Sequence, residues 1–353
     1  MHRRSFLRTI PALAATLGAR SIVGAHQGGA GKSRRQVMTV RGPIDARELG
    51  FTLSHEHALV SFQPYQELTR SPVPYARDEV VDVVLPHLTR ARALGCRAFV
   101  DATPQFLGRD ATLLRTLSEK SGLHVITPTG NYAARNHQHL PPHAFADAPT
   151  AVAQRWIDEW RNGIDGTGVR PGFIKLGFNG GRLSDAEQRL IRAAAIAHRE
   201  TGLVIASHTG PAVSAFEQLS ELEATGVHPS AWIWVHAQAE EDLSRHVQAA
   251  ERGAWISFDG VARDTISAHL DGVLRLRDAG LLDRVLVSHD AGWYHVGEAK
   301  GGEFRPYDTV FTAFVPALRA KGFTQAEIDA VFVGNPARAF TVGVRRANAF
   351  RQR

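Results

Sequence analysis

The chain has 353 residues, of which 44% are hydrophobic and 22% charged, so it is long enough to bury the core of one α/β-barrel domain. Its formal charge of +6 comes from the amino end, because the first 35 residues hold seven Lys or Arg and no acidic residue. The rest is mildly acidic, so we expect no nucleic acid and no anionic membrane as partner. The single cysteine, Cys96, excludes an internal disulfide and Cys-rich metal sites, so any metal must bind His and carboxylate side chains.

The amino end carries an export signature. Residues 1–25 contain Arg3-Arg4-Ser5-Phe6-Leu7-Arg8, a weakly apolar stretch and small residues up to Ala25, which resembles a twin-arginine signal peptide cleaved after Ala25. The apolar stretch is about ten residues long, against the ~20 that span a bilayer as a helix, so no stable membrane anchor is expected. We predict export to the periplasm and a linker over residues 26–37. A basic tail or an uncleaved anchor is the alternative interpretation.

Beyond the linker, short β-rich apolar runs alternate with amphipathic segments about every 25 to 35 residues. The predicted strands cover residues 51–57, 98–103, 124–130, 172–176, 203–208, 231–236, 254–258 and 285–289. The predicted helices cover residues 78–93, 110–121, 151–162, 185–200, 213–225, 240–251, 265–278 and 307–320. Cap-like residues precede three of these helices, at Asp110, Ser184 and Asp264. Glycines expected in the left-handed region follow six of them, at Gly95, Gly122, Gly202, Gly226, Gly253 and Gly280.

Eight βα units predict an α/β fold, a (β/α)8 TIM barrel over residues 38–342 with a short N-terminal β segment and a basic tail over residues 343–353. A doubly wound open sheet is the alternative, because periodicity cannot show whether a sheet closes.

Polar residues at the strand ends form one set, at the barrel face where the βα loops build functional sites. His55 and His57 alternate on the first strand and point to one side, while Glu56 points to the other. Lys175 ends the fourth strand in an apolar run, where an unpaired ammonium is costly to bury. Singly, these residues have structural explanations, such as a satisfied core histidine, a snorkelling lysine or a capping aspartate. Together they predict a metal centre made of His55, His57, Lys175, His208, His236 and Asp290.

These residues resemble the phosphotriesterase family of the amidohydrolase superfamily over residues 38–342. The resemblance rests on Thr52-Leu53-Ser54-His55-Glu56-His57, Gly108-Arg109-Asp110, Thr129-Gly130, Phe173-Ile174-Lys175, His208-Thr209, Leu286-Val287-Ser288-His289-Asp290 and Gly334-Asn335-Pro336-Ala337-Arg338. It implies that His55, His57 and Asp290 hold a buried metal and that His208 and His236 hold a more exposed one. It also implies that carbamylated Lys175 bridges the metals, and that the chain forms a homodimer.

The resemblance implies hydrolysis by a hydroxide that bridges two divalent metals, whose bound water has a pKa of ~7 instead of 15.7. His and carboxylate ligands suit Zn²⁺ best, with Mn²⁺, Co²⁺ and Fe²⁺ as alternatives. Asp290 is the expected catalytic base. The sequence departs from the family at Gly260, where phosphotriesterases carry a histidine and related lactonases an arginine, which puts a proton relay there in doubt. Asp259 is expected to hydrogen-bond Asp290 or a water.

The expected substrates are lactones or carboxylic esters, with phosphotriesters as a further activity. Phosphotriester hydrolysis as the main activity, an amide substrate, and a non-catalytic metal-binding protein are the alternatives. The substrate pocket is expected in the loops after strands 3, 4, 7 and 8, with candidates Asn131, Tyr132, Phe178, Asn179, Asp259, Trp293, Tyr294 and His295. Residues 292–304 are Gly-rich and are predicted to move over the site as a lid.

Overall fold

The structure is a computed structural model that describes residues 35–347. The predicted leader, residues 26–34 of the predicted linker and residues 348–353 lie outside the described residues. Within residues 35–347, no helix combines the length and the apolar character that crossing a membrane requires.

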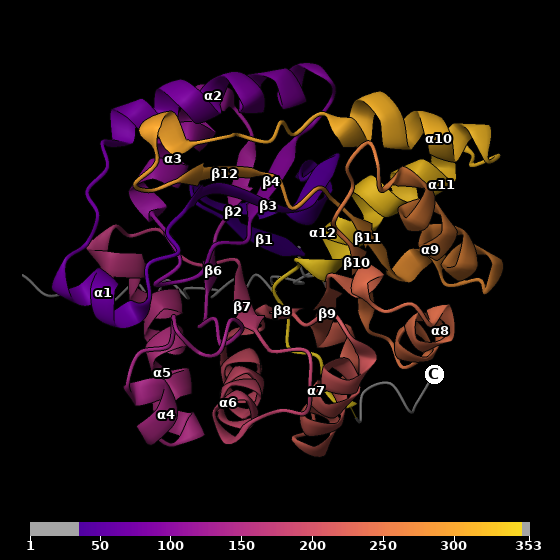
Figure 1. Cartoon of the computed structure of the whole chain (residues 1–353). Helices are drawn as coiled ribbons and strands as arrows, with labels where there is room; N and C mark the ends of the chain where they lie inside the picture. Colours follow the sequence, from indigo (N-terminus) through magenta and orange to yellow (C-terminus); the bar gives the residue numbers. More distant parts are fainter. Residues whose placement is uncertain (1–34, 348–353) are drawn as a thin grey trace, which may run out of the picture. The chain divides into compact units, whose positions relative to one another are not determined.

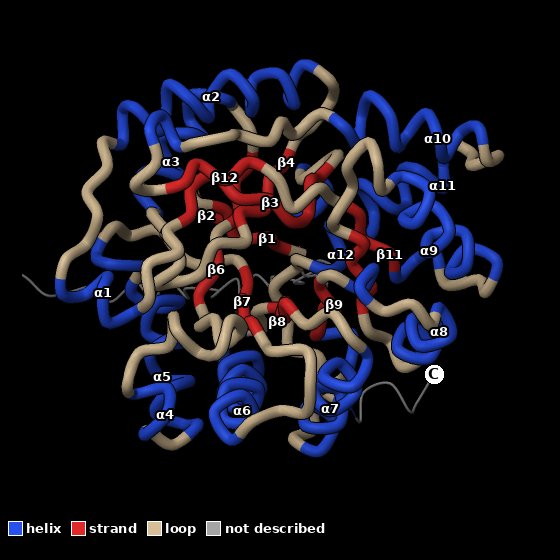
Figure 2. Tube along the Cα trace, in the orientation of Figure 1, coloured by secondary structure: helices blue, strands red, loops and turns tan. Residues whose placement is uncertain are grey.

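Strands occupy the centre of the molecule and helices surround them (Figures 1 and 2). The barrel strands are β3 (Thr52–Val60), β4 (Ala98–Asp101), β5 (His124–Ile126) with β6 (Pro128–Thr129), β7 (Phe173–Gly177), β8 (Val204–His208), β9 (Trp232–Val235), β10 (Trp255–Phe258) and β11 (Val285–Val287). Neighbours pair in parallel, in the order β3-β4-β5 and β6-β7-β8-β9-β10-β11. The third predicted strand is thus interrupted at Thr127.

The barrel closes where β11 meets β3, through side-chain and backbone hydrogen bonds. Ser54 Oγ donates to the Val287 carbonyl at 3.3 Å, and the Glu56 carboxylate accepts from Ser288 Oγ at 2.7 Å. Asp290 N–H donates to the His55 carbonyl at 3.1 Å. The predicted TIM barrel is therefore confirmed, and the open-sheet alternative is excluded.

The helices are α1 (Tyr65–Arg70), α2 (Arg77–Ala93), α3 (Ala111–Ser121), α4 (His143–Ala146), α5 (Pro149–Asn162), α6 (Asp185–Thr201), α7 (Ala212–Ala224), α8 (Leu243–Glu251), α9 (Ile266–Asp278), α10 (Val315–Ala320), α11 (Gln325–Asp329) and α12 (Asn335–Ala339). Asp110 caps α3 as predicted, and Ser184 forms a capping box with Glu187 on α6. The Asp264 cap was wrong, because Thr265 is the N-cap of α9 and no side chain caps it. The six predicted helix-ending glycines all have positive φ.

Apolar side chains fill the lower part of the barrel, at the amino ends of the strands. Inward positions alternate along each strand, so Phe173 and Lys175 point inward from β7 while Ile174 packs outward against the helices. The antiparallel hairpin of β1 (Gln36–Thr39) and β2 (Gly42–Asp45) and the end of α12 plug the base, where Phe340 packs against Phe173 with ring centroids 5.6 Å apart. The inward-facing polar side chains therefore lie at the upper end, at the carboxyl ends of the strands.

Two peripheral segments differ from expectation. The first four residues of the predicted lid form β12 (Gly292–His295), which pairs in parallel with β3, so this part is a strand fixed to the barrel. Residues 343–347, assigned to the basic tail, contact the barrel base: Gly343 N–H donates to the Gly202 carbonyl at 2.9 Å, and the Arg345 guanidinium donates to the carbonyls of Ser230 and Ala339. The packed domain therefore extends a few residues beyond the predicted boundary.

Candidate metal centre

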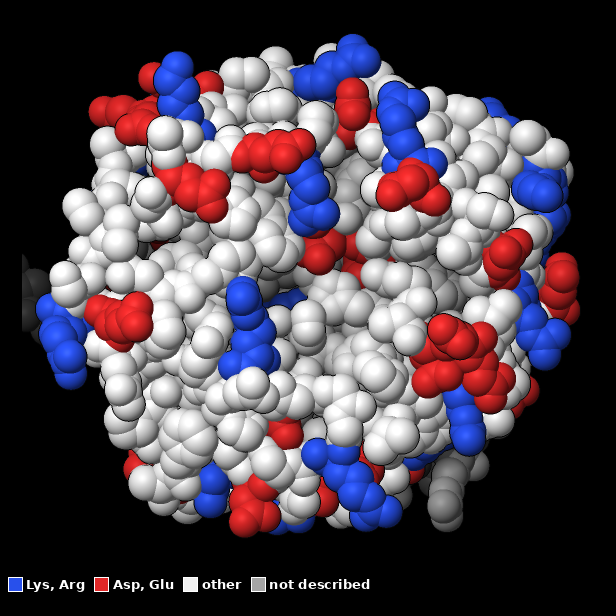
Figure 3. Space-filling view, in the orientation of Figure 1, with Lys and Arg blue, Asp and Glu red and all other residues white. Residues whose placement is uncertain are grey.

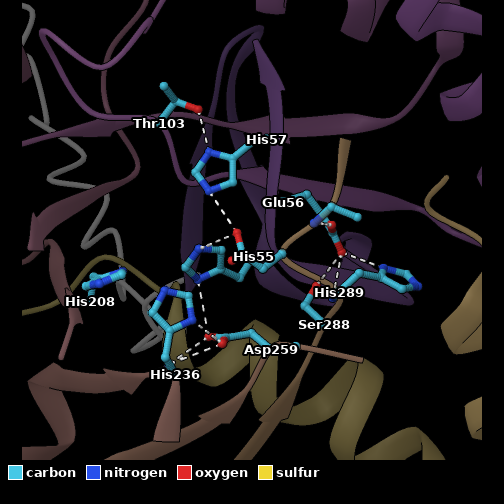
Figure 4. A network of polar contacts seen from close by, with 12 residues as sticks. His55, Glu56, His57, Thr103, His208, His236, Asp259, Ser288 and His289 are labelled. Carbon is cyan, nitrogen blue, oxygen red and sulfur yellow. Dashed lines mark hydrogen bonds and ion pairs between the residues drawn. The ribbon is translucent and has the colours of Figure 1, made fainter. Parts of the chain in front are cut away.

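The structure brings the six predicted metal ligands together in one cavity at the carboxyl ends of the strands. Figure 4 shows the four histidines of this set. His55 Nε2 lies 3.5 Å from Lys175 Nζ and 3.5 Å from Asp290 Oδ1, and His57 Nε2 lies 3.1 Å from the same oxygen. The His236 ring packs 5.0 Å from the ring of His55 and 4.3 Å from that of His208. Donor atoms of His55, His236 and Asp290 all lie within 4.8 Å of one another.

Two kinds of backbone conformation direct these side chains into the cluster: regular strand positions and left-handed residues after a strand. Lys175 and His208 occupy inward positions in regular strands, as alternation predicts. His236 and Asp290 follow their strands and adopt left-handed φ values of 60° and 52°. Because Val235 already points inward, simple alternation would turn His236 away, and the left-handed residue redirects its ring toward the barrel axis.

Hydrogen bonds fix the tautomers of three histidines. Thr103 Oγ donates to the Leu59 carbonyl and so accepts from His57 Nδ1 at 2.7 Å. Asp259 accepts from Nδ1 of His236 at 2.7 Å and lies 3.3 Å from Nδ1 of His55. Each ring is therefore left with an Nε2 lone pair, the arrangement typical of metal-binding imidazoles.

Asp259 is fully buried behind the histidines and does not line the cavity, so its assignment to the substrate pocket was wrong. Its carboxylate also accepts from Ser257 Oγ at 2.8 Å and from Gln238 Nε2 at 3.2 Å. Burial alone would raise the pKa of Asp259, but the electrostatic attraction and hydrogen bonds of His236 and His55 hold it well below its usual range. Among the described residues it has no hydrogen bond to Asp290, one of the two expected partners; it contacts the histidines instead.

Glu56 supports the turn that carries Asp290. Its buried carboxylate accepts from Ser288 Oγ, from the backbone N–H and Nδ1 of His289 at 3.1 and 2.7 Å, and from the Ala291 N–H at 2.9 Å. These donors flank Asp290 on both sides. His289 Nε2 in turn accepts from the Val310 N–H at 2.8 Å. This network was missed in the sequence, although Glu56 was expected to point away from the two ligand histidines.

The pKa shifts of Lys175, His55 and Asp290 favour the binding of cations in the cluster. Burial lowers the pKa of Lys175 to about 8 and that of His55 to about 4. Burial alone would raise the pKa of Asp290, but the imidazoles of His57, His55 and His236 hold it below its usual range. Asp290 Oδ1 is buried and has no hydrogen-bond donor, and it faces the His57 lone pair. Two acceptors 3.1 Å apart repel unless a proton or a metal cation lies between them.

These donors fit divalent metals. Three imidazole nitrogens, an orphaned carboxylate oxygen and a buried amine supply the N and O ligands that zinc and related metals prefer. Lys175 lines the same cavity as the four histidines, with Nζ 3.5 Å from His55 Nε2.

A cavity of about 50 Å³ opens onto the cluster. Of the predicted pocket residues, Tyr132 and Trp293 line it, and the Tyr132 hydroxyl lies 3.2 Å from His208 Nδ1. Asn179 and His295 do not line it, and neither do Asn131, Phe178 and Tyr294. Phe62 and Leu107, which no strand-end argument could find, complete the wall.

A side chain at Gly260 would require the end of the Gln238 side chain to shift. A Cβ at this position would lie 2.8 Å from Gln238 Nε2 and 3.3 Å from His269 Nε2. His269 is fixed between the Gly260 N–H and the Thr265 carbonyl. The neighbour of Asp259 is thus the neutral amide of Gln238, which cannot relay a proton as an imidazole does.

Comparison with known proteins gives consistent matches. The profile of the Phosphotriesterase family matches residues 35–340. The "Phosphotriesterase homology protein" of Escherichia coli (strain K12) is 30% identical over 295 residues, covering 82% of this chain and 98% of the relative. The "Aryldialkylphosphatase" of Saccharolobus solfataricus is 27% identical, covering 84% and 97%. The solved structure of the organophosphorus hydrolase from Deinococcus radiodurans superposes with a TM-score of 0.79 at 29% identity, covering 88% and 98%.

Proposed function

The chain belongs to the phosphotriesterase family of hydrolases, and from this we propose that its cluster of six ligands holds two divalent cations and hydrolyses ester bonds, with lactones and carboxylic esters preferred over phosphotriesters.

The observation that carries this proposal is the set of free donor atoms at one end of the barrel. Three histidines are held through Nδ1, so each Nε2 keeps a lone pair, and Asp290 Oδ1 is buried without a donor. Lys175 is buried, with His55 Nε2 at 3.5 Å as its side-chain hydrogen-bond partner among the described residues. Carbamylation removes the cost of burying the Lys175 ammonium. The amine nitrogen attacks CO2 and releases a proton, and the resulting carbamate is an anionic ligand. Zn²⁺ is the metal that we expect.

The chain's own groups then divide the work. Bound divalent cations would acidify a water and polarise the scissile carbonyl or phosphoryl oxygen. Asp290 accepts the proton of the attacking water and returns it to the leaving oxygen. Asp259 holds the rings of His55 and His236, and Glu56 holds the turn that carries Asp290.

The missing relay supports a preference for lactones. A lactone expels an alkoxide that must be protonated, but ring opening keeps this oxygen tethered near Asp290, so a second proton carrier matters less. Phosphotriester hydrolysis as the main activity is the second candidate, because the named relatives include an aryldialkylphosphatase and an organophosphorus hydrolase.

Elemental analysis and paired kinetics test the proposal. We expect about two metals per chain and loss of turnover on chelation. In kcat/KM, lactones and aryl carboxylic esters should exceed phosphotriesters, and Asp290→Asn should reduce lactone turnover more than turnover of triesters with good leaving groups. A fully active metal-free protein contradicts the metal centre. A tenfold preference for phosphotriesters, ~1.4 kcal/mol in transition-state stabilisation, contradicts the ranking.

A further inference from the structure

Two arginines stand over the aromatic wall of the cavity. The Arg135 guanidinium carbon lies 4.6 Å from the ring centre of Phe62, and that of Arg305 lies 4.8 Å from the ring centre of Trp293. Phe62 and Trp293 both line the cavity, with ring centroids 5.5 Å apart. Figure 3 shows basic side chains beside the central hollow of this face. The entrance is thus bordered by two cations stacked on its own walls.

Arg135 differs from the arginines of the barrel that are buried or ion-paired. Arg109 makes two bonds to the Glu159 carboxylate at 2.6 and 2.8 Å. Arg135 is exposed, and within residues 35–347 its guanidinium makes the contact with Phe62 but no ion pair and no hydrogen bond. Arg305 donates to the Asp290 carbonyl, so part of its hydrogen-bonding capacity is already used. Arg135 therefore has the free donors at this entrance.

The backbone holds Arg135 in a strained conformation. Arg135, Asn136 and His137 have φ values of 60°, 56° and 63°, three consecutive non-glycine residues in the left-handed region. Such strain persists only where the surroundings enforce it, and it gathers at ligand-binding sites. Asn179 fastens this turn, since its Oδ1 accepts from the Asn136 N–H at 3.2 Å and its Nδ2 donates to the Ala133 carbonyl at 3.3 Å. Asn179, predicted as a pocket residue, thus positions Arg135 instead.

The lining of the cavity indicates which part of a substrate meets Arg135. The metal ligands and the rings of Phe62 and Trp293 line the same cavity. A substrate whose scissile group lies at the metal ligands therefore extends past these rings, on which the guanidinium groups of Arg135 and Arg305 are stacked. A neutral chain would leave the donors of Arg135 facing solvent, whereas a carboxylate, sulfonate or phosphate would accept from them.

We propose that the preferred substrate carries an anionic group at the end remote from the scissile bond, and that Arg135 binds this anion. The inference rests on the proposed hydrolase function and specifies its substrate class. Planar recognition by a guanidinium that is already stacked on an aromatic ring loses little conformational freedom on binding.

Two esters with the same leaving group test the proposal on the metal-loaded protein. Mono-4-nitrophenyl adipate ends in a carboxylate, and 4-nitrophenyl hexanoate has the same acyl length but ends in a methyl group. We expect kcat/KM to be higher for the adipate ester, and Arg135→Gln to lower the adipate-to-hexanoate ratio about tenfold, the value of one exposed charge-assisted contact. Arg135→Lys should restore part of the ratio, and added salt should lower it in the unmodified protein but not in Arg135→Gln.

Arg182→Gln is the matched control, because Arg182 lies in the loop before α6, has a side chain 90% exposed and lines a separate groove. Its ratio should equal that of the unmodified protein. If both esters are hydrolysed and Arg135→Gln leaves the ratio unchanged, the anion site is refuted while the hydrolase function stands. If neither ester is hydrolysed, calorimetry with adipate decides: binding weakened about tenfold by Arg135→Gln supports the anion site, and unchanged binding refutes it.

Discussion

Both ends of the barrel bury histidines, but the two ends differ in how many of the ring nitrogens are hydrogen-bonded. At the base, His198 Nδ1 donates to the Leu203 carbonyl at 2.8 Å and its Nε2 accepts from the Arg345 N–H at 2.9 Å, so both nitrogens are used. At the top, His55 and His236 each use Nδ1 on Asp259; within residues 35–347, His55 Nε2 has only the 3.5 Å contact with Lys175 Nζ, and His236 Nε2 has no hydrogen-bond partner. The ring nitrogens at the base are therefore satisfied by the fold, whereas those at the top keep lone pairs that a cation can bind.

Buried cations show the same contrast. The Arg345 guanidinium donates to the carbonyls of Ser230, Arg338, Ala339 and Thr341 at 2.9 to 3.1 Å, even though burial lowers its pKa to about 10. Within residues 35–347, the hydrogen-bond partner of Lys175 Nζ is His55 Nε2 at 3.5 Å. The described residues therefore surround the basal cation with acceptors and give the upper one a single long hydrogen bond.

Sequence patterns located the upper cluster because strand ends and alternation are local properties. Lys175 and His208 lie at regular inward positions, so their convergence follows from the parallel barrel alone. Asp259 and Asn179 were misassigned because their depth and partners depend on tertiary packing: one lies behind the histidines and the other fastens a turn. Arg135 gave no signal, since its place at the entrance depends on a left-handed loop that no periodicity encodes. The leader and the homodimer stay predictions.

The largest expected effect comes from removing the upper cation. Lys175→Ala should lose bound metal and reduce ester turnover ~10³-fold, because the cations lose their shared anion. Short carboxylates added to the solution should restore part of both by filling the gap. Arg345→Met is the matched change at the base and should lower the melting temperature while metal content, measured by elemental analysis, stays the same. Equal metal content in Lys175→Ala and the unmodified protein would show that Lys175, like Arg345 at the base, is not needed for metal binding.

A smaller effect is expected at the seam between β11 and β3, where the fully hydrogen-bonded Glu56 carboxylate supports the turn that carries Asp290. Glu56→Gln keeps the shape but turns an amide N–H toward donors that include the His289 ring, leaving at least one buried donor unpaired. We expect a loss of about 2 kcal/mol in the free energy of unfolding, and metal affinity about tenfold weaker because the Asp290 turn loosens.

Ser288→Ala is the control for Glu56→Gln, since it removes one donor and leaves the backbone bonds from His289 and Ala291. It should cost about 1 kcal/mol in stability and leave metal affinity unchanged. Chemical denaturation and metal titration measure the two quantities separately. Unchanged metal affinity in Glu56→Gln would show that Glu56 stabilises the seam without positioning Asp290.

The smallest effect tests whether the base behaves as a purely structural site. Burial lowers the pKa of His198 to about 4, against about 6.5 in the unfolded chain. Between these values the unfolded chain binds more protons than the folded one, so this contribution to stability is complete above pH 6.5 and is lost as the pH falls toward 4. The maximum slope for one proton is about 1.4 kcal/mol per pH unit.

His198→Gln cannot titrate, and its amide can replace both hydrogen bonds. We expect the drop in melting temperature between pH 7.5 and pH 5 to be smaller in the variant by roughly 4 °C, from ~2 kcal/mol at about 2 °C per kcal/mol for a large domain. The buried histidines of the metal centre also titrate, but they contribute equally to both proteins and cancel from the comparison. Ester turnover at pH 7.5 should be the same in both, because His198 lies at the end of the barrel away from the cavity. An equal drop in both proteins would mean that protonation of His198 does not require the Arg345 contact to break, and that the base is less tightly satisfied than its hydrogen bonds indicate.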